Sequence, residues 1–206
     1  METLNLPKCK CLLSELNIGI LFLLILKFKL TIRFLTIMEL FEALFNRRSI
    51  RKYTNEKVSD EQIEKIIEAG MYAPSAVNKQ PWHFIVFRSQ ETIEALIEIH
   101  PNASMLKHAS AGILICFDQH LQHDEGYGPV DCSAATQNML IAAHGFGLGA
   151  CWVGIYPRQN RIELLHKMLK LPEHVIPFAV ISIGFPNEER NKPQRFQKDR
   201  IHIEKW

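Results

Sequence analysis

The stretch NRRSIRKY (46–53) combines cations and a hydroxyl within a few residues. Its four cations are Arg47, Arg48, Arg51 and Lys52. Ser49 lies between them. Guanidinium groups present forked N–H donors that match the oxygens of a phosphate. The stretch therefore indicates an anion-binding site for nucleic acid, a lipid surface or one small phosphate, although a solvated helix end would show the same residues.

Net charge separates these alternatives. The chain has 24 Lys/Arg and 22 Asp/Glu residues, a formal net charge of +2. Residues 1–37 hold five of the basic and two of the acidic residues, so residues 38–206 hold 19 and 20 and have a net charge of −1. A domain that binds nucleic acid normally shows a basic surplus. We therefore expect no nucleic-acid partner and a cluster that binds one small anion.

A second stretch with binding chemistry is APSAVNKQPWHF (73–84). Prolines stiffen this predicted loop, in which Ser75 and Asn78 offer a hydroxyl and an amide. These groups suit a polyol or the edge of a heterocycle. A polar connection that leads to a core Trp82 is the alternative.

The glycine-rich stretch GFGLGACWVG (145–154) superficially resembles a dinucleotide-binding fingerprint. That fingerprint needs a strand before its glycines and a helix after them. Here an Ala-rich segment predicted to be a helix comes first and an apolar segment follows, so the Rossmann interpretation fails. A helix end that turns into a sheet and a backbone that lies against a flat ligand both remain open.

Histidine and serine residues give only weak indications of a metal site or of serine-hydrolase chemistry. The segment HLQHDE (120–125) places two histidines beside two carboxylates, but metal ligands normally lie on defined elements, and this segment is predicted to be a loop. We predict no metal site. We expect His83, His144 and His166, which have apolar neighbours, to be packed side chains. The Gly-x-Ser-x-Gly motif of many serine hydrolases is missing.

Hydrophobic periodicity predicts the elements that must position these stretches. Ser59 and Gln62 form a capping-box pattern at the start of one helix. Helices are expected at 38–48, 59–70, 91–99, 131–144 and 161–171. Strands are expected at 83–88, 111–117 and 178–185, and 150–155 is expected to be a strand or a tight loop. Since the chain shows no internal repeat, we expect one α+β domain.

Residues 1–37 differ in composition from the rest. Leu16–Ile37 is strongly apolar, but its uninterrupted run Ile18–Leu26 covers nine residues, whereas a membrane helix needs roughly 20. Three cations follow where a signal peptide would have small residues. Our hypothesis is that the native protein starts at Met38 and that 1–37 is a mis-called or disordered extension. A membrane anchor and a packed segment are the alternatives.

The five cysteines form no Cys-x-x-Cys pair. They are Cys9, Cys11, Cys116, Cys132 and Cys151. Scattered thiols in odd number suit a reducing compartment. We expect a cytoplasmic protein without disulfides and without a membrane span.

Three of these stretches, in this order and spacing, make the chain resemble the nitroreductase family of flavin enzymes. RRSIRKY comes first, APSAVNKQPWHF follows, and GLGACWVG comes after the Ala-rich helix. A basic tail that ends in EKW completes the resemblance, which covers roughly Glu39 to Trp206. It implies that residues 38–206 form an FMN-binding α+β sandwich. A central, mainly antiparallel sheet would be flanked by helices, in an intertwined homodimer with FMN at the interface.

The resemblance implies three groups of FMN-binding residues. The phosphate and ribityl end would be held by residues of the first stretch and the tail, namely Arg47, Arg48, Ser49, Arg51, Lys192 and Arg195. The flavin ring would be bordered, from the partner subunit, by Pro74, Ser75, Ala76 and Asn78. The ring would also lie against the backbone of Trp152, Val153 and Gly154, with an N–H near flavin N5. Close backbone approach would be permitted by Gly147, Gly149 and Gly154.

The implied activity is that of an FMN-dependent NAD(P)H oxidoreductase. NAD(P)H would deliver hydride to flavin N5, and a nitroaromatic, quinone or similar small-molecule acceptor would take it in a second, ping-pong step. Because the cofactor supplies the chemistry, we assign no catalytic side chain. We expect segments 100–110 and 118–129 to cover the pocket. Flavin fragmentation, dehalogenation or enone reduction on the same fold, and a non-catalytic phosphate-binding or nucleic-acid-binding module, are the alternatives.

Overall fold

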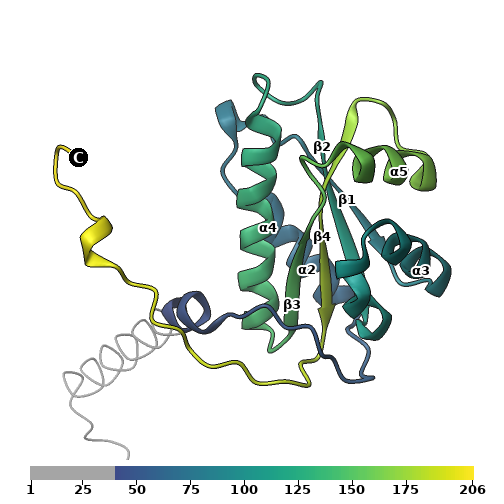
Figure 1. Ribbon diagram of the computed structural model, residues 1–206, viewed down its shortest axis with the longest axis horizontal. Coiled ribbons are helices and arrows are strands. Elements are labelled where there is room, and N and C mark those ends of the chain that lie inside the picture. The colour runs from purple at the N-terminus through teal and green to yellow at the C-terminus, as the bar shows by residue number, and fades with distance from the viewer. Residues whose placement is uncertain (1–39) are drawn as a thin grey trace, which may run out of the picture. The chain divides into compact units, whose positions relative to one another are not determined.

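A computed structural model describes residues 40–206 (Figure 1). The hypotheses on residues 1–37 therefore lie outside the described residues. Glu42–Trp206 form one compact unit. Within the described residues, no helix is both long enough and apolar enough to span a bilayer.

The described elements follow the predicted order. The strands are β1 (Trp82–Phe87), β2 (Ala111–Asp118), β3 (Gly149–Gly154) and β4 (Val175–Gly184). The α-helices are α2 (Asp60–Met71), α3 (Gln90–Ile99), α4 (Tyr127–Gly145) and α5 (Gln159–Leu169). Short 3₁₀ helices are η1 (Ala76–Asn78), η2 (Pro101–His108) and η3 (Lys198–Arg200), and residues 40–46 are also helical. The capping box of Ser59 and Gln62 is present at the start of α2.

The four strands form one antiparallel sheet in the order β1-β2-β4-β3. The predicted α+β class with an antiparallel sheet is thus confirmed. β2 and β4 are central, which explains their long apolar runs, because both of their faces are covered. Within the described residues β3 is an edge strand, so half of its backbone groups point away from the sheet.

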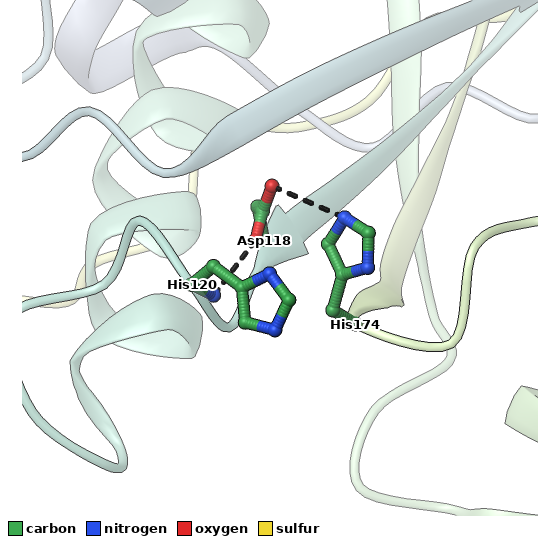
Figure 2. Close-up of side chains that lie close together, drawn as sticks. All are labelled: Asp118, His120 and His174. Carbon is green, nitrogen blue, oxygen red and sulfur yellow. Dashed lines mark hydrogen bonds and ion pairs between the residues drawn. The ribbon is translucent and has the colours of Figure 1, made fainter.

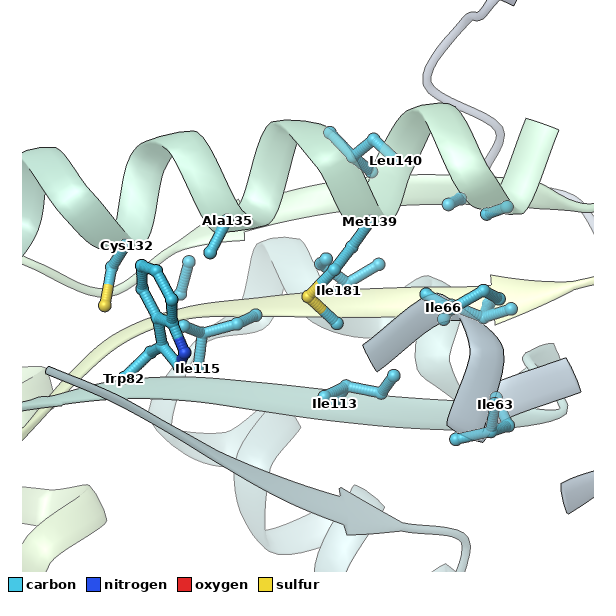
Figure 3. Packing of buried hydrophobic residues seen from close by; sticks show 14 of the residues in the cluster. Ile63, Ile66, Trp82, Ile113, Ile115, Cys132, Ala135, Met139, Leu140 and Ile181 are labelled. Atoms are coloured by element: carbon cyan, nitrogen blue, oxygen red, sulfur yellow. The ribbon is translucent and has the colours of Figure 1, made fainter. Parts of the chain in front are cut away.

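Helices cover the two faces of the sheet in separate layers (Figure 1). Ile113 and Ile115 of β2 pack against α2 and α4, where Met139 lies in the middle of the buried cluster (Figure 3). The alternate residues Leu114 and Cys116 pack on the opposite face against α3, η2 and α5. This alternation is what the period of two in a strand requires.

The cation stretch runs along the outer edge of β3. The N–H of Ile50 donates to the carbonyl of Ala150 at 3.0 Å. A Cβ atom on Gly149 would lie 2.7 Å from Ile50, and one on Gly184 would lie 2.8 Å from the ring of Tyr53. These two glycines therefore make room for the segment, and the sheet edge fixes the positions of its cations.

Candidate functional site

A large cavity of about 1050 Å³ lies beside β3 in the described part of the chain. Its walls come from η2, β3, the start of α5 and the cation stretch. Six cations line it: Arg51, Lys52, Lys107, Arg158, Arg161 and Arg190. No carboxylate is among the described residues that line it. A cavity lined by one sign of charge attracts a ligand of the opposite sign, so an anionic ligand fits.

The backbone of β3 presents alternate groups to this cavity. The N–H of Ile155, just after β3, donates to a carbonyl of β4 at 3.0 Å. The carbonyls of Ala150 and Gly154, by contrast, contact groups on the outer side. In an antiparallel ladder the N–H and the C=O of one residue point to the same side, and successive residues alternate. The backbone groups of Trp152 therefore also point outward, whereas those of Val153 point to β4. The edge thus offers the N–H groups of Trp152 and Gly154 to a ligand.

Two of the three glycines expected to permit close approach to a ligand, Gly147 and Gly154, are open, since a Cβ atom on either would meet nothing within 4 Å. Gly149 is covered by Ile50, as described above. Gly147 has a φ of +72° in the turn that follows α4, a conformation that favours glycine. A flat ligand could therefore approach the backbone at Gly154.

Like charges converge beside the cavity. Burial lowers the pKa of Arg47, and the nearby Arg195 and Arg48 lower it further. Within the described residues, no ion pair joins Arg47 or Arg195 to a carboxylate. A bound anion would relieve this repulsion.

Arg48 has a different role from its neighbours. Its guanidinium donates to the carbonyls of Phe45 at 2.8 Å, Arg47 at 2.6 Å and Asn191 at 3.1 Å. These bonds tie the end of the first described helix to the C-terminal tail. The group is therefore occupied with backbone oxygens.

Cys151 of β3 marks the point at which the predicted phosphate-binding residues meet. Burial raises the pKa of its thiol, whereas the charge of Arg51, a hydrogen bond with the Ser49 hydroxyl and the charge of Arg47 lower it. All three residues therefore lie near one sulfur atom. The structure thus places Arg47, Ser49 and Arg51 near one another, and their role in binding phosphate stays a prediction.

Glu188 fixes the cation stretch from the tail side. Its Oε1 accepts from the N–H groups of Arg51 at 2.6 Å and Lys52 at 3.2 Å, and its Oε2 pairs with Arg190 at 2.6 Å. Burial raises the pKa of Glu188, but these hydrogen bonds and the Arg190 charge outweigh it and lower the pKa overall. One carboxylate thus holds the backbone of Arg51 and Lys52 and the side chain of Arg190, three residues that line the cavity.

His100 and Arg161 form the opposite wall. Arg161 Nη1 lies 2.8 Å from His100 Nε2 and 3.2 Å from the carbonyl of Gly154. His100 Nε2 also lies 3.1 Å from the carbonyl of Gly154, so this nitrogen can either accept from Arg161 or donate to Gly154, depending on the tautomer. Burial lowers the pKa of His100, and the charge of Arg161 lowers it further. The imidazole is therefore neutral near pH 7.

Sequence comparison identifies the family. The profile of the Nitroreductase family matches residues 44–103 and 98–185. The chain belongs to the nitroreductase family.

Three similar proteins illustrate this membership. A protein of Methanothermobacter thermautotrophicus, provisionally named an NADH dehydrogenase/NAD(P)H nitroreductase, is 48% identical over 169 residues, 82% of this chain and 88% of that protein. A provisionally named NADH dehydrogenase/NAD(P)H nitroreductase of Parabacteroides distasonis has a crystal structure with a TM-score of 0.77 and 38% identity, covering 81% and 98% of the two chains. A provisionally named nitroreductase of Desulfovibrio desulfuricans, solved in complex with FMN, has a TM-score of 0.72 and 32% identity, covering 81% and 97%.

The structure of this nitroreductase family member does not bring the second stretch to the cavity of the same chain. The segment Pro74–Asn78 contributes nothing to the described cavity lining. It is held instead at α4, where the N–H of Ala76 donates to Asp131 Oδ1 at 3.0 Å. Asp131 was expected to open a helix, but α4 starts at Tyr127 and Asp131 is buried within it.

The tail residues are also separate from the cavity lining. Lys192 Nζ lies 5.6 Å from the centre of the Phe45 ring, and Arg195 lies near Arg47. The segment 118–129, expected to cover the pocket, borders a smaller cavity of about 260 Å³, whereas seven residues of segment 100–110 do line the large one.

Sequence reasoning missed several residues of this nitroreductase family site. They are His100, Arg158, Arg161, Glu188 and Arg190. His100 is 61 residues from Arg161, and Glu188 is 137 residues from Arg51. No local pattern marks Glu188, because the adjacent Glu189 is also acidic and the two differ only in their contacts.

Proposed function

We propose that this chain is an FMN-dependent NAD(P)H oxidoreductase. The observation that carries the proposal is the meeting of cations with the open edge of β3 around one large cavity. The name of the Desulfovibrio desulfuricans relative adds that such a fold can bind FMN. Among curated relatives, a Bacillus subtilis protein named FMN reductase [NAD(P)H] is 30% identical over 182 residues, 80% of this chain and 72% of that protein.

The residues present fit FMN. Arg47, Ser49 and Arg51 would bind its phosphate and ribityl end, with Arg195 and Lys192 completing the charge balance. Because a phosphate dianion needs about two cations, the unpaired guanidinium groups match it without making the whole domain basic. Arg48 would act through the backbone by holding the tail against this cluster.

The edge of β3 would receive the flavin ring. Trp152 and Gly154 would offer N–H donors to the edge of the flavin ring. The backbone of Val153 would lie against the ring. Gly154 would let the ring reach van der Waals distance because it has no side chain. When bound, FMN supplies hydride transfer between NAD(P)H and an acceptor through its N5 atom.

The protein groups around the ring would bind and orient the two substrates in turn. Three further cations line the cavity: Lys107 of η2, Arg158 directly before α5, and Arg161 of α5. They favour anionic groups such as the phosphates of NAD(P)H. His100, whose pKa is lowered first by burial and then by the charge of Arg161, would add an uncharged side chain beside them.

We further propose a ping-pong mechanism with a nitroaromatic, quinone or similar acceptor. One cavity of this size would serve NAD(P)H and acceptor in succession. Initial rates at several fixed acceptor concentrations should give parallel double-reciprocal plots against NADH or NADPH. Intersecting plots would contradict successive use of one cavity.

The proposal includes an intertwined homodimer formed by the domain of residues 38–206. Pro74, Ser75, Ala76 and Asn78 would then border the flavin ring of the partner subunit. Large apolar side chains around that loop and in the tail are exposed: Tyr72 81%, Val77 70%, Phe196 81% and Ile203 84%. Trp206 is fully exposed. A second copy would cover these side chains, because large exposed apolar groups are typical of interaction sites.

Removing the tail tests the dimer. A chain that ends at Gln194 should elute as a monomer in size-exclusion chromatography with light scattering, and should retain less than a tenth of the FMN. The Phe196→Ala single variant should weaken the dimer without monomerising it. A truncated chain that stays dimeric and FMN-bound would contradict the proposed role of the tail.

The buried thiols are consistent with a cytoplasmic location, which we also propose. Cys116, Cys132 and Cys151 are unpaired and buried. Burial raises the pKa of Cys116 to about 12, so this thiol is protonated at neutral pH.

A further inference from the structure

A group of histidines around one carboxylate lies away from the large cavity. Asp118 is the last residue of β2, His120 follows in the next turn, and His174 directly precedes β4. Figure 2 shows the two imidazole rings side by side below the carboxylate. One possible ligand atom from each of the three residues lies within 4.8 Å of the other two. We propose that Asp118, His120 and His174 bind one divalent transition-metal ion of the zinc type.

The carboxylate is held in position for such an ion. Asp118 Oδ1 accepts from the backbone N–H of His120 at 2.7 Å. Its Oδ2 lies 3.7 Å from His174 Nε2, beyond hydrogen-bond distance. The side chain is only 12% exposed, so its rotation is restricted. A hydrogen bond to the second oxygen of a ligating carboxylate is a usual feature of metal sites.

The distances suit ligands of one ion better than they suit an ion pair. Zinc lies about 2.0–2.1 Å from histidine nitrogen and carboxylate oxygen, so two ligands of a tetrahedral ion are about 3.4 Å apart. The separation of 3.7 Å between Asp118 Oδ2 and His174 Nε2 is close to this value. The His120 and His174 rings are stacked, with centroids 4.3 Å apart and 11° between their planes. A small rotation of these partly exposed rings would bring both to the ion.

The backbone fixes the three residues relative to one another. The N–H of Gln119 donates to the carbonyl of His174 at 2.8 Å, and Asp118 pairs with Val175 in the register of β2 and β4. The ligands therefore come from the paired ends of two strands rather than from one mobile loop. Two imidazoles and a carboxylate are a donor set for zinc and similar ions. Three protein ligands leave a fourth position for water.

Two other histidines provide matched controls. His83 of β1 has its Nε2 3.7 Å from the same Asp118 Oδ2 but does not belong to the group of mutually close ligand atoms. His123 lies in the same loop as His120 and pairs instead with Asp124 at 3.4 Å. We expect neither to be a ligand.

Metal binding by untagged, full-length protein tests the proposal. Equilibrium dialysis against ZnCl₂ with metal analysis should give one tightly bound zinc per chain. His174→Gln and His120→Gln should each weaken its binding at least tenfold, as expected for the loss of a ligand. His123→Gln and His83→Gln should bind zinc as the unchanged protein does. Equal FMN content in all variants will verify their folding.

Cobalt substitution separates this site from the cysteines. Co²⁺ bound by nitrogen and oxygen lacks the intense sulfur-to-cobalt absorption that thiolate ligands produce. The unchanged protein should show d–d bands without that absorption, and His174→Gln should lose them. Absence of stoichiometric zinc binding, or zinc binding that persists unchanged in both His174→Gln and His120→Gln, would overturn the proposal.

Discussion

At the scale of single residues, the site is defined by Arg47 and Arg195, which no ion pair among the described residues joins to a carboxylate. Arg47 and Arg195 repel each other, and the pKa of Arg47 is lowered as a result of burial and this repulsion. Such an arrangement is unfavourable until an anion binds, because like charges at close range disfavour the charged forms. Binding of a phosphate should therefore stabilise the fold as well as occupy the site.

Gly154 provides the sharpest test of where the flavin ring lies. Gly154→Ala should fold normally because the added methyl group meets no protein atom within 4 Å. It should weaken FMN binding roughly 5- to 150-fold, since an extra methyl in a packed contact costs about 1–3 kcal/mol. Fluorescence titration with FMN measures the change. Gly145→Ala, which also adds a methyl into open space, is the control. Equal FMN affinity in both variants would place the ring elsewhere.

His100 predicts a dependence of stability on pH. Its pKa is lower in the folded protein than the roughly 6.5 of an unfolded histidine. As pH falls below about 6.5 the unfolded chain binds a proton that the folded chain does not, so the free energy of unfolding decreases. His144, whose pKa is also lowered by burial and by Arg47, acts in the same direction.

Denaturant unfolding of the FMN-free protein at pH 7 and pH 5 measures this dependence. His100→Gln should lose less stability between the two pH values than the unchanged protein. The difference can reach at most about 1.4 kcal/mol per pH unit. His108→Gln, at an exposed position in η2, should behave as the unchanged protein. An unaltered pH dependence in His100→Gln would show that the imidazole is not held neutral.

At the scale of elements, the sequence predicts what depends on local periodicity. β2 and β4 are continuous apolar runs, and α2 has its capping box, so they could be located directly. η2 was missed because PNASMLKH has no regular apolar repeat. The first turn of α4 was missed because it contains Gly128 and Pro129, although proline is tolerated in the first turn of a helix.

The candidate site was only half predictable for a related reason. The stretch 47–53 could be recognised because its cations are close together in the chain. Glu188, His100 and Arg161 act through contacts over long sequence distances. The histidine group behaves likewise, because His174 is 54 residues from His120 and only strand pairing brings them together.

The tail and the cation stretch are coupled through Glu188. Glu188→Ala leaves two backbone N–H groups and Arg190 without their acceptor, which should destabilise the fold by about 1–3 kcal/mol. It should also weaken FMN binding severalfold without removing a proposed ligand contact, because Arg51 loses its support. Thermal unfolding and FMN titration measure both effects.

Glu189→Ala is the matched control for this prediction. Glu189 is the adjacent residue and is exposed. Substitution there should change neither stability nor FMN affinity by more than a few tenths of a kcal/mol. If Glu188→Ala binds FMN as tightly as Glu189→Ala, the tail does not position the cation stretch.

At the scale of the whole molecule, one chain contains most of the proposed site but not all of it. The cation stretch, the edge of β3, η2 and α5 meet around one cavity. The segment Pro74–Asn78 lies at α4, and large apolar side chains nearby and in the tail are exposed. The proposed dimer explains both features at once, because each subunit would complete the cavity of the other.

An absorbance spectrum of the purified full-length protein, followed by anaerobic addition of NADH or NADPH, tests the central claim most directly. We predict one FMN per chain after reconstitution and dialysis, with bands near those of free FMN. Either NADH or NADPH should bleach these bands within one turnover, and a quinone or nitroaromatic should restore them. A protein that retains no FMN after reconstitution, or whose bound FMN neither nucleotide bleaches, would contradict an FMN-dependent NAD(P)H oxidoreductase.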